Sequence, residues 1–535
     1  MEDKKEKPKD KMEVEEEKKD LDKKDEIKKL EETIYSIKIG DLNYDESLAL
    51  AEKIKKEGNE LFQNNKFLEA LDKYTEAINL KVETKNNAVY YSNRALTNLK
   101  LENYGSAIED SNMALKIDPN FAKAVQRRAD AYIALNKLAD AIKDLLFLQQ
   151  KFPGDKGVEE KLERTRNKKK RQNYYLAFSS KDRGLPEFTI EKVLKDSKPS
   201  SSYKGPVFPE DGKITKEWVI DLIDRMKDLD NKKSFSEKYI DKFYLLKMLL
   251  KVKQIFCAHR PSLVDVTIPN DKKFTVVGDI HGQFYDLLNI FEINGYPDEE
   301  NPYLFNGDYV DRGVFSLECL TTLLAFKILY PNHFFMARGN HESTNLNQMY
   351  GFKNEVNDKY GKDQKMYECF TDFFRSLPLG HILNKKVLVV HGGLFSKDGV
   401  TIDQIKEIDR FKEIPESGLM SELLWSDPCR ENGRIPSKRG VGMSFGPDVA
   451  LKFLKDNNLE LLIRSHEVKT EGYEIEPCEK VITIFSAPNY CDQMGNKGAI
   501  IIFKGEDILK PTFKQFEASP HPNIPIRKYM NNYIF

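Results

Sequence analysis

Short apolar runs that end in polar, glycine-containing turns dominate the centre of the chain. Residues 274–277, 303–305 and 333–337 are three such runs, and they lead into GDIHG (278–282), GDYVDRG (307–313) and RGNHE (338–342). An apolar run of this length that ends in glycine and a polar group indicates a buried strand with reactive side chains at its carboxyl end. We therefore expect the functional centre between residues 274 and 342.

The same pattern continues downstream. Runs at 387–390, 461–463 and 481–485 lead into HGG (391–393), RSHE (464–467) and SAPNY (486–490). Six apolar strands with intervening helices predict an α/β sandwich whose site gathers at the carboxyl ends of the strands. Four of the 8 histidines directly follow strands, whereas the others, His521 among them, are expected to be structural or surface residues. Asp, Asn and His are the donors that divalent transition metals accept.

The amino-terminal part has a different periodicity, that of amphipathic helices, and it repeats. Gly58, Ala95 and Ala129 occupy equivalent places, spaced by 37 and then 34 residues, and Pro119 and Pro153 are also 34 apart. Small residues at these places allow two antiparallel helices to approach closely. A helix–turn–helix period of 34 residues predicts three tetratricopeptide repeats over 49–156, followed by a helix at about 157–176.

A chain of 535 residues is too long for one core, so several domains are expected. Residues 1–48 are mostly Lys, Glu and Asp, a composition that predicts a disordered tail. After the repeats we expect an extended helix and linker (157–210), including KPSSSYKGP (198–206). The catalytic domain is assigned to 211–515, and a tail or helix to 516–535.

Composition limits the cellular compartments and the classes of partner that we expect for this chain. A net charge of -1 argues against strong attraction to nucleic acid or to an anionic membrane. The 6 scattered cysteines form no CxxC pair, so neither a zinc ribbon nor a disulfide framework is indicated. The sequence shows no signal peptide or long apolar span, which predicts a cytoplasmic protein. The basic run 168–171 leaves nuclear import open, although a solvated helix end explains it as well.

The motifs resemble those of metallophosphoesterases, and specifically the serine/threonine protein phosphatases. LLWSDP (423–428), SKRGVGMSFGPDV (437–449) and SAPNYCDQMGNKG (486–498) extend the resemblance. Repeats placed before the phosphatase domain match the type 5 family, over about residues 50–525, and not types 1, 2A or calcineurin. The resemblance implies a multidomain fold, an all-α tetratricopeptide solenoid followed by an α/β metallophosphoesterase domain, a β-sandwich with flanking helices. The Lys/Glu-rich start and IRKYMNNYIF (526–535) depart from the pattern.

The resemblance also implies a two-metal site that hydrolyses phosphoserine and phosphothreonine in proteins. A hydroxide shared by the two cations would attack the phosphate directly. The cations would be manganese, or iron and zinc, since this ligand set accepts all three. By resemblance the first metal takes Asp279, His281 and Asp308, and the second takes Asp308, Asn340, His391 and His466.

Around the metals, the resemblance assigns roles in binding phosphate and in proton transfer. Arg312 and Arg439 would hold the phosphate oxygens. His341, aimed by Asp311, would protonate the leaving alkoxide as the general acid. Tyr490 would donate a hydrogen bond to the phosphate or to the attacking hydroxide.

Two features predict partners and regulation. A set of groove residues resembles the carboxylate clamp of co-chaperone repeats, which grips the C-terminal peptide of heat shock protein 90 or its relatives; a solvated helix face is the alternative. Glu102 matches the family position that reaches Arg312, so the repeats would fold over the cleft and inhibit the enzyme; a solvent-facing glutamate is the alternative. The groove residues are Lys55, Asn59, Asn93, Lys123 and Arg127.

Three alternative functions fit parts of the sequence. A chaperone-bound scaffold with an inactive phosphatase fold is disfavoured because the ligand set is intact. An esterase for diesters or nucleotides is disfavoured by the RSHE and SAPNY contexts. Cys369 and Arg375 have the C-x5-R spacing of tyrosine phosphatases, but the residues between them lack the glycine that a phosphate-binding loop needs. We expect a monomer that acts on phosphoproteins, with no nucleic-acid partner and no membrane embedding.

Overall fold

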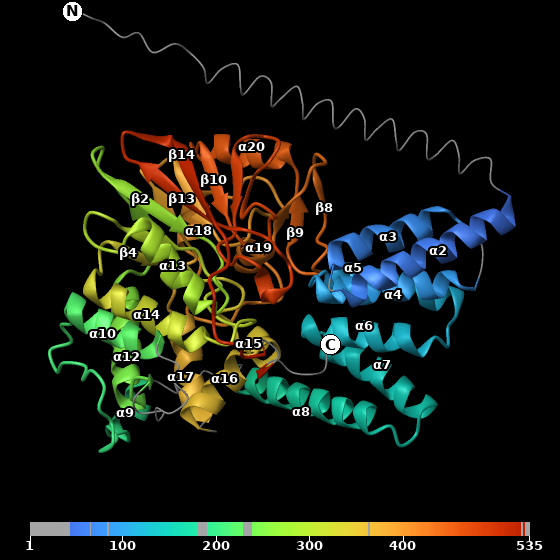
Figure 1. Cartoon of the computed structure of the whole chain (residues 1–535), viewed down its shortest axis with the longest axis horizontal. Helices are drawn as coiled ribbons and strands as arrows, with labels where there is room; N and C mark the ends of the chain where they lie inside the picture. Colours follow the sequence, from blue (N-terminus) through green and yellow to red (C-terminus); the bar gives the residue numbers. More distant parts are fainter. Residues whose placement is uncertain are drawn as a thin grey trace, which may run out of the picture.

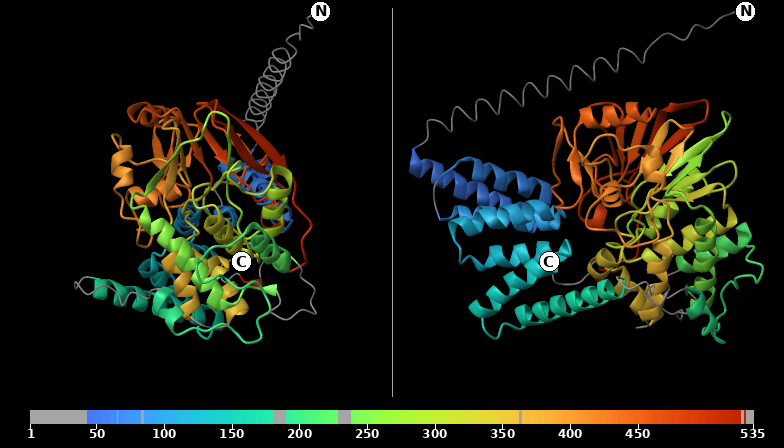
Figure 2. Two further views of the ribbon diagram at one scale, coloured as in Figure 1. Left: turned by 90° about the vertical axis from the view of Figure 1, so that its left-hand side faces the viewer. Right: turned by 180° about the vertical axis from the view of Figure 1, so that it is seen from behind.

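The structure is a computed structural model that describes residues 43–64, 66–82, 85–179, 190–227, 238–361, 364–525 and 528–529. The tail expected at 1–48 and the divergent end at 526–535 fall largely outside these residues. A stack of helices lies beside a larger α/β unit, and Figures 1 and 2 show the two parts in contact along one side. Within the described residues, no helix is long and apolar enough to cross a membrane.

Paired antiparallel helices form the amino-terminal part, as the 34-residue period predicts. Gly58 permits the close approach expected of it, since a Cβ there would lie 2.9 Å from the ring of Tyr74. The repeat is visible in ion pairs as well, because Arg94–Asp110 and Arg128–Asp144 are equivalent pairs, each at 2.7 Å. The helices are α2 (Tyr44–Gln63), α3 (Phe67–Asn79), α4 (Asn87–Lys100), α5 (Tyr104–Ile117), α6 (Ala122–Ala134), α7 (Leu138–Lys151) and α8 (Lys156–Ser179).

Two sheets packed face to face form the α/β unit. The first has the order β1-β5-β6-β10-β12-β11 and the second β14-β13-β2-β3-β4, with a small sheet β7-β9-β8 beside them. The predicted strands are present as β2 (Lys273–Val277), β3 (Tyr303–Phe305), β4 (Phe334–Met336), β6 (Val387–Val390), β10 (Leu461–Arg464) and β12 (Val481–Ile484). The others are β1 (Leu263–Val266), β5 (Gly380–Leu383), β7 (Asp427–Pro428), β8 (Arg434–Pro436), β9 (Met443–Phe445), β11 (Tyr473–Ile475), β13 (Gly498–Lys504) and β14 (Asp507–Phe516).

Alternate residues of the buried strands serve different apolar clusters. Val276 and Val389 pack between the two sheets, whereas their neighbours Val277 and Val390 face outward against helices. Because both faces of these strands are covered, β6 is apolar throughout and β2 ends in two valines. The covering helices are α9 (Ile190–Lys195), α10 (Lys216–Lys227), α12 (Lys242–Ala258), α13 (Phe284–Asn294), α14 (Ser316–Leu329), α15 (Thr344–Tyr350), α16 (Phe352–Tyr360), α17 (Gln364–Phe374), α18 (Ile402–Lys406), α19 (Leu419–Trp425) and α20 (Pro447–Asp456). The sandwich with flanking helices is therefore confirmed.

The two sheets meet where β2 and β12 end, and this junction positions the site. Ser486 donates its backbone N–H to the Asp279 carbonyl at 3.1 Å, and its Oγ accepts from the Gly278 N–H at 2.8 Å. The same hydroxyl donates to the Ala499 carbonyl at 2.6 Å. Turns from both sheets are thereby tied together, which places the predicted ligands at one edge of the sandwich.

We predict that Gly278→Ala destabilises the α/β unit. A Cβ at this position would lie 2.4 Å from the Ile484 carbonyl oxygen, a backbone atom that cannot move aside cheaply. We expect a loss of about 1–3 kcal/mol, measured by calorimetry as a fall of several degrees in the midpoint of the α/β transition. In the control Gly157→Ala, the new Cβ meets only a side-chain oxygen of Asp155 at 3.2 Å. Equal midpoints in both variants would contradict the close approach.

Candidate metal and phosphate site

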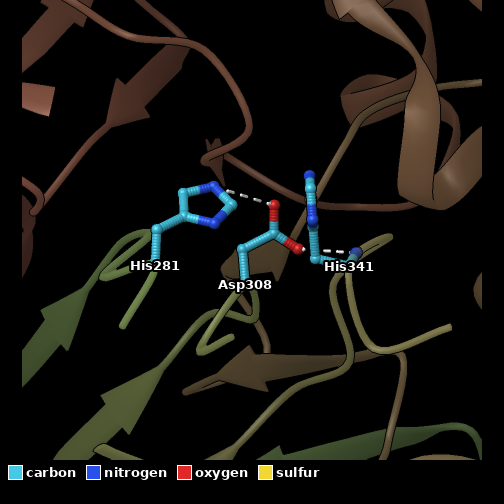
Figure 3. A group of neighbouring side chains, drawn as sticks. All are labelled: His281, Asp308 and His341. Carbon is cyan, nitrogen blue, oxygen red and sulfur yellow. Dashed lines mark hydrogen bonds and ion pairs between the residues drawn. The ribbon is translucent and has the colours of Figure 1, made fainter. Parts of the chain in front are cut away.

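Asp308, in the turn that follows β3, lies at the centre of the predicted site. It has a φ of 52°, a left-handed conformation that the fold must enforce. The fully buried Glu342 enforces it, because its carboxylate accepts the backbone N–H groups of Asp308, Tyr309 and Gly339 at 2.8–2.9 Å. In Figure 3 the Asp308 carboxylate lies between the ring of His281 and residue His341.

Two of the predicted histidine ligands have a fixed tautomer. Nδ1 of His281 lies 3.0 Å from the Val310 carbonyl, and Nδ1 of His391 lies 2.9 Å from the Asn306 carbonyl. Each Nδ1 must carry the proton to donate these bonds, so each Nε2 offers its lone pair. Those Nε2 atoms face the same Asp308 oxygen, at 3.5 Å and 3.3 Å respectively.

Asn340 and His466 complete the predicted set. The amide atom of Asn340 that faces the site, its carbonyl oxygen, lies 2.9 Å from His391 Nε2, 3.3 Å from His466 Nδ1 and 3.1 Å from Asp308 Oδ2. The Asn340 amide thus meets lone pairs on both histidines, which its nitrogen satisfies as a donor when the amide is turned, and which a bound cation would satisfy when the oxygen faces them. The buried Nε2 of His466 has no hydrogen-bond partner within the described part of the chain.

The charges of this cluster fit divalent cations. Burial, together with the nearby Asp308, raises the pKa of Asp279 to about 8 even though His391 acts in the opposite direction. Burial also raises the pKa of Asp308 well above its ordinary value, and it lowers those of His281 and His466. Two adjacent buried carboxylates cannot both ionise without positive charge beside them. The residues present therefore suit the metals that the resemblance implies.

The two predicted phosphate-binding arginines are oriented by different partners. Arg312 follows the Asp308 turn, and its guanidinium carbon lies 3.7 Å from the centre of the Tyr350 ring. Arg439 donates through Nε to Asp427 at 2.6 Å and through Nη2 to the His466 carbonyl at 2.9 Å. Asp427 also accepts from Arg464 at 2.7 Å. Although burial raises the pKa of Asp427, these two arginines hold it below its usual range.

His341 and Asp311 form the predicted pair. His341 Nδ1 lies 2.8 Å from Asp311 Oδ2, and Asp311 also accepts from the Asn347 side chain at 3.0 Å and from the Phe352 N–H at 2.9 Å. The orientation of His341 toward Asp311 is as predicted. Burial first, and then the nearby Arg312, lower the pKa of His341 well below 6.5. Burial raises the pKa of Asp311 to about 7.

Tyr490 also reaches the cluster, with its ring centre 5.2 Å from that of His281. Burial raises the pKa of its hydroxyl well above 10, so the group remains a proton donor. The competing pair Cys369 and Arg375 forms no site. Cys369 is buried in α17, and Arg375 forms an ion pair with Glu413 at 3.1 Å.

The repeats cover this site in the structure. Glu102, between α4 and α5, forms an ion pair with Arg312, and its other oxygen lies 4.0 Å from His341 Nε2. The Ser106 N–H donates to the Lys438 carbonyl at 3.1 Å. Apolar residues from both parts share one cluster beside these contacts, namely Leu99, Tyr104 and Leu135 from the repeats and Leu346, Tyr350 and Trp425 from the α/β unit.

The structure brings most of the predicted groove residues together. The Asn59 side-chain oxygen accepts from Asn93 at 3.0 Å and from the Tyr74 hydroxyl at 2.8 Å. Arg127 donates to Ser92 on α4, the helix that carries Asn93. Lys55 pairs with Glu52, a residue of its own helix, at 2.5 Å. Lys123 is exposed one turn before Arg127.

Several residues that shape the site were missed from the sequence. Glu342, Asn347, Tyr350 and Asp427 touch predicted site residues from elements that only the fold brings near. For Glu342 the signal was its place in RGNHE beside two predicted residues, and for Asp427 its place in LLWSDP. Asn347 and Tyr350 carried no such signal, because they act through α15, which follows the ligand turn.

Comparisons with known proteins agree with this geometry. A family model described as calcineurin-like phosphoesterase matches residues 272–470, and one described as the PPP5 TPR repeat region matches residues 162–265. Serine/threonine-protein phosphatase 5 of Mus musculus is 44% identical over 493 residues, covering 92% of this chain and 95% of the relative. Serine/threonine-protein phosphatase T of Trypanosoma brucei brucei is 47% identical over 474 residues, covering 88% and 96%.

A solved structure is also similar. It is a protein serine/threonine phosphatase from Saccharomyces cerevisiae, described as similar to human phosphatase PP5. The two chains are 40% identical with a TM-score of 0.54, and the match covers 58% of this chain and 99% of the yeast chain.

We predict that metal binding releases protons. With a pKa of about 8, Asp279 in the metal-free protein is mostly protonated at pH 7 and must lose its proton to become a ligand. Titration calorimetry with Mn²⁺ in buffers of different ionisation enthalpy should show proton release at pH 7 that diminishes above pH 8. Asp279→Asn, which has no such proton, should release less. Binding without proton release at pH 7 would contradict the assigned charge state.

Proposed function

This chain belongs to the serine/threonine-protein phosphatase 5 family, and on that premise we propose that it hydrolyses phosphoserine and phosphothreonine in proteins at a two-metal site. The chain is a serine/threonine protein phosphatase with tetratricopeptide repeats and a metallophosphoesterase domain. One observation carries the two-metal proposal. The Nε2 lone pairs of His281 and His391 converge on one Asp308 oxygen, within 3.5 Å and 3.3 Å.

The proposed metals are manganese, or iron and zinc, because oxygen and imidazole donors accept all three. When bound, two such cations supply an activated water nucleophile at neutral pH and neutralise charge on the phosphate. The predicted ligands would hold them, with Asp308 shared by both. Arg312, stacked on Tyr350, and Arg439, fixed by Asp427, would hold the phosphate oxygens as negative charge grows on them.

His341 is the proposed general acid. Its Nε2 faces the place that the Glu102 carboxylate occupies in the closed arrangement, so it would face the leaving oxygen of a bound phosphoserine. Its Nδ1 is held by Asp311, which favours the imidazolium form. A phosphate dianion beside the ring raises the pKa of His341, opposing the effect of burial and Arg312.

Autoinhibition is supported by the contacts of Glu102. A carboxylate beside Arg312 imitates a phosphate oxygen and occupies its binding place. Substrate and the repeats, called the lid here, therefore exclude each other. The apolar cluster between Leu135, Tyr350 and Trp425 stabilises the closed arrangement as well. The uncovered cleft is the proposed active form.

Recruitment by heat shock protein 90 type chaperones is supported by the groove. Asn59, Asn93 and Arg127 lie together, with cationic and amide donors suited to a terminal carboxylate. The same helices reach the lid contact. α4 carries Asn93 and is followed by Glu102, whereas α6 carries Arg127 and is followed by Leu135. A peptide that shifts α4 against α6 would therefore weaken the lid.

We predict that His341→Ala separates substrates by their leaving groups. On a phosphoserine peptide, kcat should fall about 10²–10⁴-fold, because serine alkoxide needs a proton to leave. On p-nitrophenyl phosphate the fall should be much smaller, since nitrophenolate leaves unprotonated. Initial rates with Mn²⁺ measure both. Equal losses on the two substrates would remove His341 as the acid. Inactivity on both of a Glu102→Ala chain with His341 intact would favour a scaffold.

We predict that Glu102→Ala raises basal activity on p-nitrophenyl phosphate about tenfold, a typical coupling between two parts of a protein. Glu109→Ala, on the exposed face of α5, serves as the matched control. An acidic peptide with a free terminal carboxylate should activate the wild type but not Arg127→Ala, and its amidated form should do nothing. Unchanged activity in Glu102→Ala would rule out the lid.

A further inference from the structure

The turn that carries Tyr490 has an unusual backbone. Asn489, Cys491 and Asp492 have φ values of 41°, 56° and 53°, so three non-glycine residues around Tyr490 are left-handed. Such a turn persists only when its surroundings hold it. Asn496 holds the inner side, because its backbone carbonyl accepts the Asn489 N–H at 2.7 Å and its side chain accepts the Tyr490 N–H at 2.9 Å. A second set of contacts comes from outside the turn.

A segment from the end of the chain provides it. Residues 517–525, called the strap here, follow β14 without forming a helix or a strand. The Ser519 N–H donates to Asp286 Oδ1 at 2.7 Å, and Gln283 Nε2 donates to Asp286 Oδ2 at 2.8 Å. The same Gln283 amide donates to the Pro488 carbonyl at 2.9 Å. The buried Asp286 therefore links the strap to a residue two positions before Tyr490.

The strap reaches the other side of the turn through His521. Its Nε2 lies 3.1 Å from Asp492 Oδ1, two residues after Tyr490. Burial lowers the pKa of His521, but the Pro522 carbonyl and Asp492 outweigh it and raise that pKa above 6.5, which favours the charged pair. The Tyr490 turn is thus held on both sides by the same short segment.

The far end of the strap is anchored too. Ile524 packs against the apolar cluster that covers the second sheet, and the buried Tyr529 accepts from Asn354 of α16 at 2.7 Å through its carbonyl. The Tyr529 hydroxyl donates to Asp358 of the same helix at 2.9 Å. Figure 1 shows the carboxyl-terminal segment running from β14 toward α15 and α16. Anchors at both ends keep His521 and Ser519 in place.

We propose that the strap is a positioning device for catalysis, and that Asp286 and His521 are positioning residues that fix the Tyr490 hydroxyl toward the phosphate. His521 and Asp286 touch no reacting atom and act only through the turn at 488–492. The proposal rests on the proposed function, because it requires Tyr490 to take part in phosphate hydrolysis. It does not depend on the lid, which contacts the site from the opposite part of the chain.

Full-length variants, all carrying Glu102→Ala to keep the cleft open, test this with p-nitrophenyl phosphate and Mn²⁺. His521→Ala should lower kcat about fivefold, as small misplacements of catalytic groups do, and leave KM nearly unchanged. His521→Gln, which can still donate to Asp492, should restore most of it. Lys452→Ala removes a comparable exposed ion pair, with Asp456 on α20, and should have no effect. Melting temperatures check that each variant folds.

The decisive comparison adds Tyr490→Phe. If the strap acts through the Tyr490 hydroxyl, His521→Ala lowers kcat in the tyrosine background and adds nothing in the phenylalanine background. Equal losses in both backgrounds would overturn the proposal, as would a loss with Tyr490→Phe but none with His521→Ala; both results leave the phosphatase assignment intact. Full activity in Tyr490→Phe would exclude the Tyr490 hydroxyl from the reaction and would overturn the proposed role of the strap. Inactivity of the chain that carries Glu102→Ala alone would contradict the proposed function itself.

Discussion

The structure depends on the way in which the buried Glu342 carboxylate holds three backbone amides around Asp308. Those bonds fix a left-handed residue at the end of β3 and direct its carboxylate into a space lined by histidines. Without them the Asp308 turn would relax to an ordinary conformation and point its side chain elsewhere. Glu342 itself comes from the turn after β4, so the pairing of β3 with β4 is part of the site.

Electrostatics explains the arrangement of the charged groups that surround Asp308. The buried carboxylates of Asp279 and Asp308 suit cations, and the proposed cations, with Arg312 and Arg439, would make a cleft that favours an anion. In the closed arrangement the anion is the Glu102 carboxylate. On the proposed function, substrate phosphate and the repeats would compete for one place. A single electrostatic requirement then supports both the proposed catalysis and its proposed control.

Much of this architecture could be predicted from the sequence. Strands that end in ligand turns can be predicted, because their apolar runs and glycine-containing ends are local signals. Accordingly, β2, β3 and β6 lie where they were expected. Strands such as β5, β11 and β14 were missed because no ligand turn follows them, although each pairs with a strand that is its neighbour in sequence. The fold class and the meeting of Asp279, Asp308, Asn340 and His391 were predictable for the same reason.

Contacts between residues that are far apart in sequence were harder to predict. Asp427 binds Arg439 and Arg464 across three segments, and His521 meets Asp492 only because the chain returns after β14. His521 was expected to be structural or at the surface, and it does lie at the surface, but its partner could not be read from its neighbours. The burial of His341 beneath the repeats was also out of reach, because it depends on how the two parts of the chain pack.

The central claim is that Asp308 is shared by two cations, and electron paramagnetic resonance of the full chain loaded with Mn²⁺ tests it most directly. Two ions bridged by one carboxylate are magnetically coupled, so the account predicts the spectrum of an exchange-coupled pair at two equivalents of metal. The spectrum of isolated Mn²⁺ ions at that stoichiometry would contradict it.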